Sequence, residues 1–242
     1  MSELILEGWV SVLAALESQR RPIEHVFVQQ GKDVRNLGHI ERQATQQAIP
    51  LQFVSGDEID RRAAGKSHGG VLAVVGERRF DSLDALAQAG GWVAMLDGVE
   101  DPYNYGQAIR ALYAAGASGL VAPLRNWDTA LNVVARASAG ASEYMPTARA
   151  GVLEALHFFK GRGYQCVATA KERGSTALYQ ANLRGPLFLL IGGERRGLNA
   201  AAQALCDTLV SIPYGRDYRA ELDVTSSTAA LAFEVLRQRS QT

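Results

Sequence analysis

The first part of the chain alternates between two hydrophobic periods. Apolar residues recur at helical spacing from Glu7 to Gln19, which predicts an amphipathic helix that ends before Pro22. Short apolar runs and further helical patterns follow. They predict strands at His25–Gln29, Leu51–Val54 and Val71–Val75, and helices at Leu37–Gln47 and Asp57–Ala63. Residues 1–76 are therefore expected to form a small α/β domain.

The second part of the chain contains more uniformly apolar runs, beyond a segment at 77–90 that we interpret as a linker. Such runs are typical of strands buried on both faces of a parallel sheet. The predicted strands are Trp92–Leu96, Leu120–Val121, Tyr164–Thr169, Leu187–Ile191 and Leu209–Ile212, with helices at Tyr105–Ala115 and Thr129–Ser138. Residues 91–242 are expected to form a parallel-sheet α/β domain.

Two turns near the C-terminus follow directly on predicted strands, Gly192-Gly193-Glu194 and Ile212-Pro213-Tyr214. Open parallel sheets bind ligands at the carboxyl ends of their strands, and glycine lets the main chain approach a ligand closely. The glycine fingerprints of P-loops and of dinucleotide-binding folds are absent from this stretch. The alternative is a purely structural turn, in which the glycines serve only to bend the chain.

Composition narrows the class of protein. Hydrophobic residues make up 47% and charged residues 21%, as in ordinary soluble globular proteins. The formal net charge of +0 argues against a strongly electrostatic nucleic-acid binder but leaves room for local arginine patches. Cys166 and Cys206 lack metal-ligand spacing, so no metal site is expected. Without a signal peptide or a spanning apolar run, a cytoplasmic protein with no membrane segment is expected.

Asn104 and Arg110 are candidates for site chemistry. Asn104 stands where a strand gives way to a helix, with Gln107 three residues later, so a helix-capping pair also explains both. Arg110 follows Gly106 by four residues on one helical face, and its guanidinium can pass over the glycine to the loop at Asn104. An arginine beside a helix N-terminus suits a phosphate or a developing oxyanion. A solvent-exposed helix arginine is the alternative.

Three further residues have both a functional and a structural interpretation. Glu194 can bind a ligand hydroxyl or orient Arg110, or it can interact with a helix dipole. Glu143, in the stretch SAGASEYMP, is similarly ambiguous. His68 stands in a loop before a strand, as a turn residue or a recognition residue, and a lone histidine there is not a metal site.

Three ordered motifs, together with a shorter segment between the first and the second, resemble one family, the SpoU/TrmH branch of the SPOUT RNA methyltransferases. The motifs are LDGVEDPYNYGQAIRALYAAGA from Leu96, LLIGGERRGLN from Leu189 and IPYGRDYRAELDVTSSTAALAFE from Ile212, and the shorter segment is ARASAGASEYMP from Ala135. The N-terminal part is similar to the ribosomal-protein-like RNA-recruiting domain of several members. The resemblance covers nearly the whole chain, and a Rossmann-type nucleotide-binding enzyme is disfavoured because its glycine fingerprint is missing.

The resemblance implies a C-terminal trefoil knot, a bound S-adenosylmethionine and a homodimer. It implies methyl transfer to a ribose 2′-hydroxyl of ribosomal or transfer RNA, and the recruiting domain favours ribosomal RNA. Neither a metal nor a membrane is involved. The implied catalytic residues are Asn104, which positions the ribose or its phosphate, Arg110, which stabilises the hydroxyl as its proton leaves, and Glu194, which holds the arginine or the cofactor side.

The resemblance also suggests which residues line the sites. The cofactor-binding residues are expected to be Thr169, Ile191, Gly192, Gly193, Ile212, Leu222 and Asp223. The RNA-binding residues are expected to be Arg20, Arg21, His68, Glu143 and Arg195. Most of the latter fall in arginine pairs or in the ambiguous loops described above, and scattered solvated charges are the alternative interpretation.

One departure from the family pattern concerns the third motif. The family usually has S-L-N-V-S, whereas this chain has Glu221-Leu222-Asp223-Val224-Thr225, with one residue more between Pro213 and Leu222. Attraction to a sulfonium or an arginine makes an acid at Asp223 tolerable. The alternative is an RNA-binding or ribosome-assembly factor with a degenerate pocket. The presence of Asn104, Arg110 and Glu194 favours an enzyme.

Overall fold

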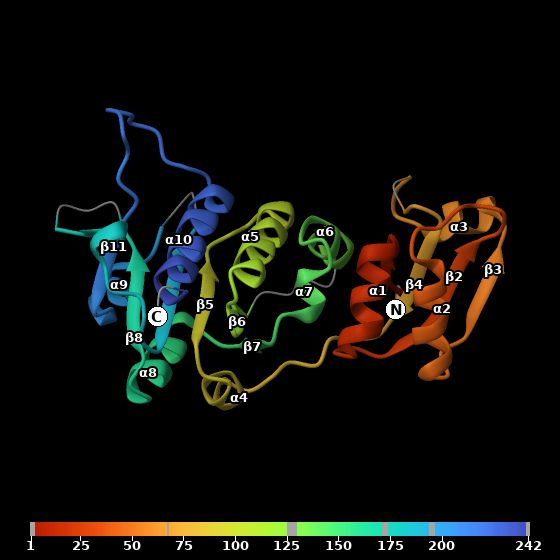
Figure 1. Cartoon of the computed structure of the whole chain (residues 1–242), viewed down its shortest axis with the longest axis horizontal. Helices are drawn as coiled ribbons and strands as arrows, with labels where there is room; N and C mark the ends of the chain where they lie inside the picture. The colour runs from red at the N-terminus through yellow and green to blue at the C-terminus, as the bar shows by residue number, and fades with distance from the viewer. Residues whose placement is uncertain (1–2, 67, 125–129, 171–173, 194–196, 241–242) are drawn as a thin grey trace. The chain divides into compact units, whose positions relative to one another are not determined.

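The computed structural model describes residues 3–66, 68–124, 130–170, 174–193 and 197–240, and the chain forms two compact units (Figure 1). Unit 1 comprises residues 1–79 together with 126–144. Unit 2 comprises residues 80–125 and 145–242. Residues 130–144 lie within the sequence of the predicted second domain, yet they belong to unit 1. Among the described residues, no helix is long and apolar enough to cross a membrane.

Unit 1 contains a four-stranded sheet with the strand order β1-β4-β2-β3. Strand β4 pairs antiparallel with β1 and β2, and β2 pairs parallel with β3. Its elements are β1 (Leu4–Glu7), α1 (Trp9–Ser18), β2 (Ile23–Gln29), α2 (Leu37–Gln46), β3 (Leu51–Val54), α3 (Gly56–Arg62), β4 (Val71–Val75), α6 (Leu131–Ala137) and α7 (Ala141–Tyr144).

The strands and helices predicted for residues 23–75 are confirmed, but the start of the chain is not. The predicted helix began at Glu7, whereas Glu7 ends β1 and pairs with Leu72 of β4. A four-residue strand is too short to reveal its period in the sequence. Strand β4 is consequently an inner strand of the sheet.

Residues 130–144 pack against α1. Ala135 of α6 is fully buried among the apolar residues of α1 and the sheet. Gly140 has a positive φ of 80°, and a Cβ atom there would lie 2.7 Å from the Cβ of Ala14 and 3.1 Å from the carbonyl oxygen of Val10. The turn between α6 and α7 therefore needs glycine to approach α1 so closely.

Unit 2 contains a seven-stranded sheet with the order β7-β6-β5-β10-β8-β11-β9. Every pairing in it is parallel, as the uniformly apolar runs predicted. Its elements are α4 (Leu83–Gln88), β5 (Trp92–Asp97), α5 (Pro102–Ala114), β6 (Gly119–Ala122), β7 (Thr147–Arg149), α8 (Val152–Gly161), β8 (Gln165–Thr169), β9 (Thr176–Ala177), the 3₁₀ turn η2 (Leu178–Gln180), β10 (Leu187–Gly192), α9 (Ala200–Leu205), β11 (Thr208–Ser211) and α10 (Val224–Arg239).

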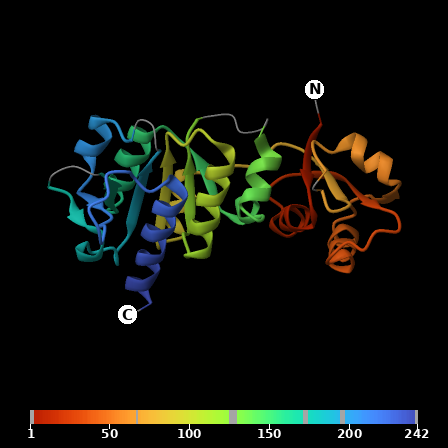
Figure 2. The same ribbon diagram turned by 90° about the horizontal axis from the view of Figure 1, so that it is seen from above.

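Helices cover both faces of this sheet (Figure 2). Helices α5 and α10 pack on each other over one face. Helices α4, α8 and α9 enclose an apolar core on the other, in which the ring of Phe159 stacks on Phe188 of β10 at 4.6 Å. Strands β5 and β10 are buried over most of their length, because both of their faces carry helices.

The order of the strands brings two loops to one edge of the sheet. From β5 the chain proceeds outward to β6 and β7, and it later returns to place β10 on the other side of β5. Asp97 and Gly192, the last residues of β5 and β10, are paired. The carboxyl ends of strands at such a reversal of order form the usual ligand crevice of open α/β sheets. The C-terminal trefoil knot that the family resemblance implies does not follow from this strand order, and it stays a prediction.

Candidate active site

The loop after β5 leads into α5 through an aspartate cap. Asp101 is the N-cap residue, and its Oδ1 accepts a hydrogen bond from the backbone N–H of Asn104 at 2.8 Å. The capping role predicted for Asn104 and Gln107 is therefore wrong, because Pro102 begins the helix three residues earlier than expected. Asn104 lies within the first turn, and the side-chain amide of Gln107 donates instead to the hydroxyl of Tyr103.

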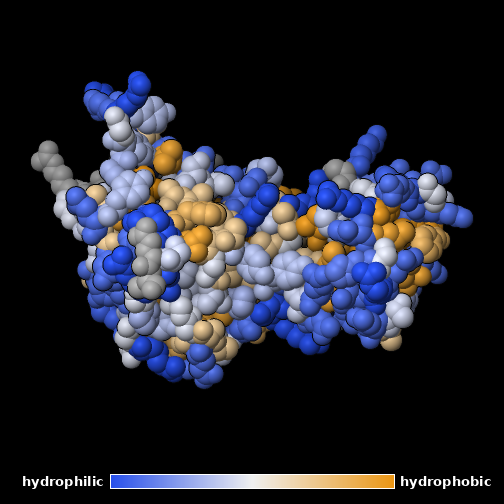
Figure 3. Space-filling view, viewed as in Figure 1, coloured by the Kyte–Doolittle hydropathy of each residue, from blue (hydrophilic) through white to orange (hydrophobic). Residues whose placement is uncertain are grey.

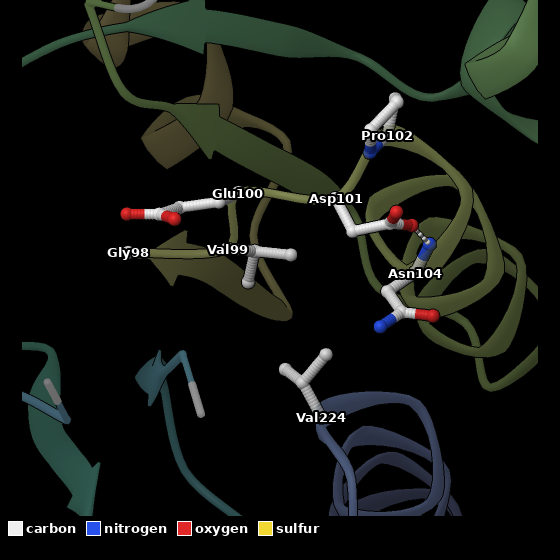
Figure 4. Close-up of a pocket in the computed structure, with 7 residues that line it drawn as sticks. All are labelled: Gly98, Val99, Glu100, Asp101, Pro102, Asn104 and Val224. Carbon is white, nitrogen blue, oxygen red and sulfur yellow. Dashed lines mark hydrogen bonds between the residues drawn. The ribbon is translucent and has the colours of Figure 1, made fainter. Parts of the chain in front are cut away.

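This loop and the start of α10 enclose a cavity of about 330 Å³ (Figure 4). The side chains of Asn104 and Val224 both point into the space between α5 and α10, whereas the carboxylate of Glu100 points away from Asn104. The lining residues are Gly98, Val99, Glu100, Asp101, Pro102, Asn104 and Val224. Asn104 is thus placed beside a cavity large enough for a small substrate group.

A second, larger cavity of about 730 Å³ lies at the carboxyl ends of β8, β10 and β11. Val224 also lines this cavity, so the two spaces share a wall. The predicted cofactor residues that line it are Thr169, Ile191, Gly192, Gly193, Ile212 and Leu222. The strand-end turns singled out in the sequence are therefore brought together by the sheet.

Two glycines that line the larger cavity are held by hydrogen bonds from their backbone N–H groups. The N–H of Gly193 donates to the carbonyl oxygen of Asp97 at 2.7 Å, and that of Gly192 donates to Oγ1 of Thr169 at 3.2 Å. A Cβ atom on Gly193 would lie 2.1 Å from the carbonyl oxygen of Gly98. No side chain fits there, so the glycine lets two backbone segments cross in direct contact.

Asp223, predicted as a cofactor-binding residue, lines neither of the two cavities, and its contact with the cofactor stays a prediction. It is the N-cap residue of α10, and its carboxylate accepts from the backbone N–H of Ser226 at 2.7 Å and from the hydroxyl of Ser226 at 3.2 Å. Asparagine and aspartate cap helices about equally well. The acid in place of the family's amide therefore preserves this capping bond.

The side chain of Arg110 is exposed on the surface of α5. Its side chain makes no hydrogen bond or ion pair with the described residues, and it lines neither cavity. The expected approach to the loop at Asn104 is not present in the single chain. Helical spacing places Arg110 on the same side as Tyr103 and Tyr113, which are 55% and 41% exposed.

Glu194 and Arg195, predicted as a catalytic and an RNA-binding residue, lie outside the described residues. Arg20, Arg21, His68 and Glu143 all belong to unit 1. Arg20 is half-buried, and its Nε donates to the carbonyl oxygen of Tyr144 at 3.3 Å.

Arg21 and Glu143 pair with each other. Nε of Arg21 lies 2.8 Å from Oε2 of Glu143 and its second amine 3.2 Å from Oε1, and both side chains are at most 4% exposed. Nη1 of Arg78 lies 3.9 Å from the same carboxylate. The charge on Glu143 is therefore matched inside unit 1, and it fixes α7 to the residues before β2 and after β4.

His68 is also buried, and its two ring nitrogens have different partners. Nδ1 accepts from the N–H of Gly70 at 3.1 Å, and Nε2 lies 3.0 Å from the carboxylate of Asp60. These contacts favour the neutral tautomer with its proton on Nε2. They fix the turn that leads into β4.

Burial shifts the pKa of several groups in unit 2, among which Asp97 ends β5 beside the cavities and the two cysteines line neither cavity. Burial raises the pKa of the Asp97 carboxyl, and a hydrogen bond from the N–H of Gly98 partly offsets this effect. Burial also raises the pKa of the Cys166 thiol to about 12 and that of Cys206 to about 11, so neither is a nucleophile at neutral pH. Among the described residues, no three His, Cys, Asp or Glu side chains cluster as metal ligands would.

Tyr214 and Val224 line the larger cavity but were absent from the predicted site. Tyr214 lies two residues after the predicted Ile212, and Val224 directly follows the predicted Asp223. Their proximity in sequence was the available signal. Their contribution depends on how the segment between β11 and α10 folds back, which no local pattern reveals.

Two family models match the chain. Residues 91–233 match the SpoU rRNA Methylase family, and residues 5–80 match the family described as RNA 2′-O ribose methyltransferase substrate binding. Among curated proteins, the 23S rRNA (guanosine-2′-O-)-methyltransferase RlmB of Shewanella oneidensis is 32% identical, over 97% of this chain and 97% of its own. The protein of the same name from Photorhabdus laumondii is 33% identical, over 99% and 100%.

Solved structures agree with this match over both units. A crystal structure of an RNA 2′-O ribose methyltransferase has a TM-score of 0.76 and 26% identity, and the match covers 99% of this chain and 90% of that chain. The AdoMet-bound rRNA methyltransferase from Sinorhizobium meliloti has a TM-score of 0.80 and 25% identity, with coverage of 98% and 87%.

Proposed function

The chain belongs to the SpoU rRNA methylase family, and on that basis we propose that it transfers a methyl group from S-adenosylmethionine to the ribose 2′-hydroxyl of a guanosine in 23S ribosomal RNA. One observation carries the proposal beyond family membership. The cavity at the carboxyl ends of β8, β10 and β11 is lined by the family-motif residues and shares Val224 with the cavity beside Asn104. A cofactor site and an acceptor site thus adjoin.

The larger cavity suits this cofactor in size and in lining. Ligand pockets for molecules of this size span roughly 300–1,000 Å³, and this one has about 730 Å³. Ile191, Leu198 and Ile212 offer apolar contact to an adenine ring. A Cβ atom on Gly193 would collide with the backbone of Gly98, and one on Gly192 would lie only 3.1 Å from the backbone of Gly197 and Leu198. We propose that these residues hold S-adenosylmethionine.

The cofactor supplies a methyl group on a positively charged sulfonium, and the chain's own residues bring the acceptor to it. We propose that Asn104 positions the ribose or its phosphate, because its side chain points into the smaller cavity. Arg110 is proposed to stabilise the ribose oxygen as its proton leaves. An arginine scarcely deprotonates, so a phosphate or a water takes the proton. Positioning two reactants can supply a large part of the acceleration.

The choice of RNA rests on unit 1 and on the relatives. Residues 5–80 match a family whose description is substrate binding for RNA 2′-O ribose methyltransferases, and we propose that residues 1–76 recruit the RNA. The relatives' names specify a guanosine of 23S rRNA, and this chain is proposed to act on the same class of nucleotide. A cytoplasmic location belongs to the same proposal, because ribosomal RNA is the substrate.

We further propose that the enzyme works as a homodimer through α5 and α10. These two helices leave large apolar side chains exposed: Tyr103, Tyr113, Phe233 and Leu236. Apolar side chains gather over the region of α10 in Figure 3. Exposed apolar area of this kind marks association surfaces. A second copy seated there would also enclose Arg110, which lacks a partner among the described residues of the single chain.

An RNA-binding or assembly factor with a degenerate pocket is the alternative. Its main support in the sequence was Asp223, and the capping bond to Ser226 gives that residue an ordinary structural role. Titration calorimetry with S-adenosylmethionine separates the two functions. The methyltransferase proposal predicts saturable binding of one cofactor per chain, and a complete absence of binding heat would favour the assembly factor.

A further inference from the structure

The segment between β11 and α10 forms a long loop that rises from the body of unit 2 (Figure 1). Its tip is hydrophilic in Figure 3. Residues 213 and 215–223 are exposed, while Tyr214 is half-buried. The loop has two legs, the part that leaves β11 and the part that returns to α10. Residues from both legs line the larger cavity, including Tyr214 on the first leg and Leu222 on the second. The shape of the cavity therefore depends on how far apart the two legs stand.

One hydrogen bond joins the legs at their base. The backbone N–H of Leu222 donates to the hydroxyl oxygen of Tyr214 at 2.9 Å, across eight positions of sequence. The tyrosine ring is also 6.3 Å, centroid to centroid, from the ring of Tyr218. A side chain thus supplies the acceptor that ties this exposed loop together.

Two hydrogen bonds fix the second leg of the loop, one at Leu222 and one at the residue after it. The N–H of Leu222 is bound by Tyr214, and the next residue, Asp223, caps α10 through Ser226. These two bonds hold the backbone of Leu222 in one place. The loop spans residues 212–223 between β11 and α10, and a bond across its base restrains this length.

We propose that Tyr214 is a positioning residue of the cofactor site. By accepting the Leu222 N–H, its hydroxyl closes the base of the loop and presets the cavity wall before S-adenosylmethionine arrives. Preorganising a binding loop strengthens affinity because less ordering remains to be done on binding. This inference rests on the proposed function for the identity of the ligand. The bond itself is a property of the ligand-free chain.

The first test uses the ligand-free protein and the variant Tyr214→Phe, which keeps the ring and removes the acceptor. Amide hydrogen exchange at Leu222, followed by NMR, should become about fivefold faster, as expected for the loss of one ordinary hydrogen bond. Tyr179→Phe is the matched control, since that exposed tyrosine lines neither cavity, and exchange at Leu222 should stay at the wild-type rate. An unchanged exchange rate in Tyr214→Phe overturns the proposal.

The second test measures binding and turnover in the full chain. Calorimetry with S-adenosylmethionine should show about fivefold weaker binding for Tyr214→Phe and no change for Tyr179→Phe. The KM for the cofactor should rise similarly, while kcat and the KM for RNA stay the same. Faster exchange at Leu222 with unchanged cofactor affinity contradicts the positioning role. A wild-type chain that binds no cofactor contradicts the proposed function itself, and the cofactor role of Tyr214 with it.

Discussion

The carboxylate of Asp223 holds Ser226 by two hydrogen bonds, to its backbone N–H at 2.7 Å and to its hydroxyl at 3.2 Å. This pair starts α10, the helix that follows the cofactor loop. It explains how the third motif tolerates an acid where the family has an amide, because both side chains offer an oxygen to the first turn of a helix.

Asp223→Asn should therefore leave the protein nearly as stable as the wild type and change its turnover only modestly. Asp223→Ala should lower the free energy of unfolding by about 1 kcal/mol, because the cap is lost. Urea unfolding and turnover measurements on both variants check this. A complete loss of turnover in Asp223→Asn would mean that the negative charge takes part in the reaction.

Arg110→Ala should abolish methyl transfer while cofactor affinity stays close to that of the wild type, since Arg110 lines neither cavity. Arg162→Ala is a matched control in the same unit. That arginine pairs with Asp84 and lies over the ring of Phe158, and its loss should leave turnover near the wild-type rate. Normal turnover in Arg110→Ala would refute the role assigned to this residue.

Glu143→Ala should destabilise unit 1 strongly, because it leaves Arg21 as a buried charge without its main partner. Loss of one member of a buried ion pair costs roughly 3–5 kcal/mol of unfolding free energy. Urea unfolding measures the change, and Arg21→Ala/Glu143→Ala should cost less than the two single variants summed. If Glu143 contacts RNA instead, Glu143→Ala would lose RNA affinity with little change in stability.

Acid should weaken an ion pair within α10, in which Arg237 contacts Glu234 three residues earlier in the same helix. A hydrogen bond from Arg237 lowers the pKa of the Glu234 carboxyl, against the opposing effect of burial. A lowered folded pKa stabilises the protein above the unfolded value of about 4.3, and this contribution disappears as pH falls through the folded value.

Urea unfolding of the wild type and of Glu234→Gln at pH 7 and at pH 3 checks this expectation. The variant should be less stable than the wild type at pH 7, and the difference should shrink as the pH is lowered, because protonation of Glu234 removes its charge. Equal differences at both pH values would exclude a contribution from this carboxylate's ionisation.

The parallel sheet of unit 2 was predictable because its strands are buried on both faces and carry long apolar runs, as in β5 and β10. Strands β1, β7 and β9 were missed, since runs of two to four residues carry no readable period. The start of α5 was placed too late because Asn104 resembled a cap, while Asp101 and Pro102 carried the stronger signal.

The candidate site was predictable where its residues lie in a turn directly after a predicted strand, as Gly192 and Gly193 do. It was not predictable where two distant residues meet. Tyr214 and Leu222 are joined across a loop, and Arg21 and Glu143 are 122 positions apart. Such pairs arise from the tertiary fold, so no local pattern reveals them. The family resemblance supplied the cofactor and the reaction, which spacing and composition alone did not determine.

Labelled methyl transfer tests the central claim most directly. The purified protein is incubated with methyl-labelled S-adenosylmethionine and ribosomal RNA from cells that lack it, and the RNA is then digested to nucleosides for mass spectrometry. The proposed function predicts label in 2′-O-methylguanosine from 23S RNA, and none with Arg110→Ala. Absence of label from ribosomal RNA, with a protein that binds both cofactor and RNA, would contradict it.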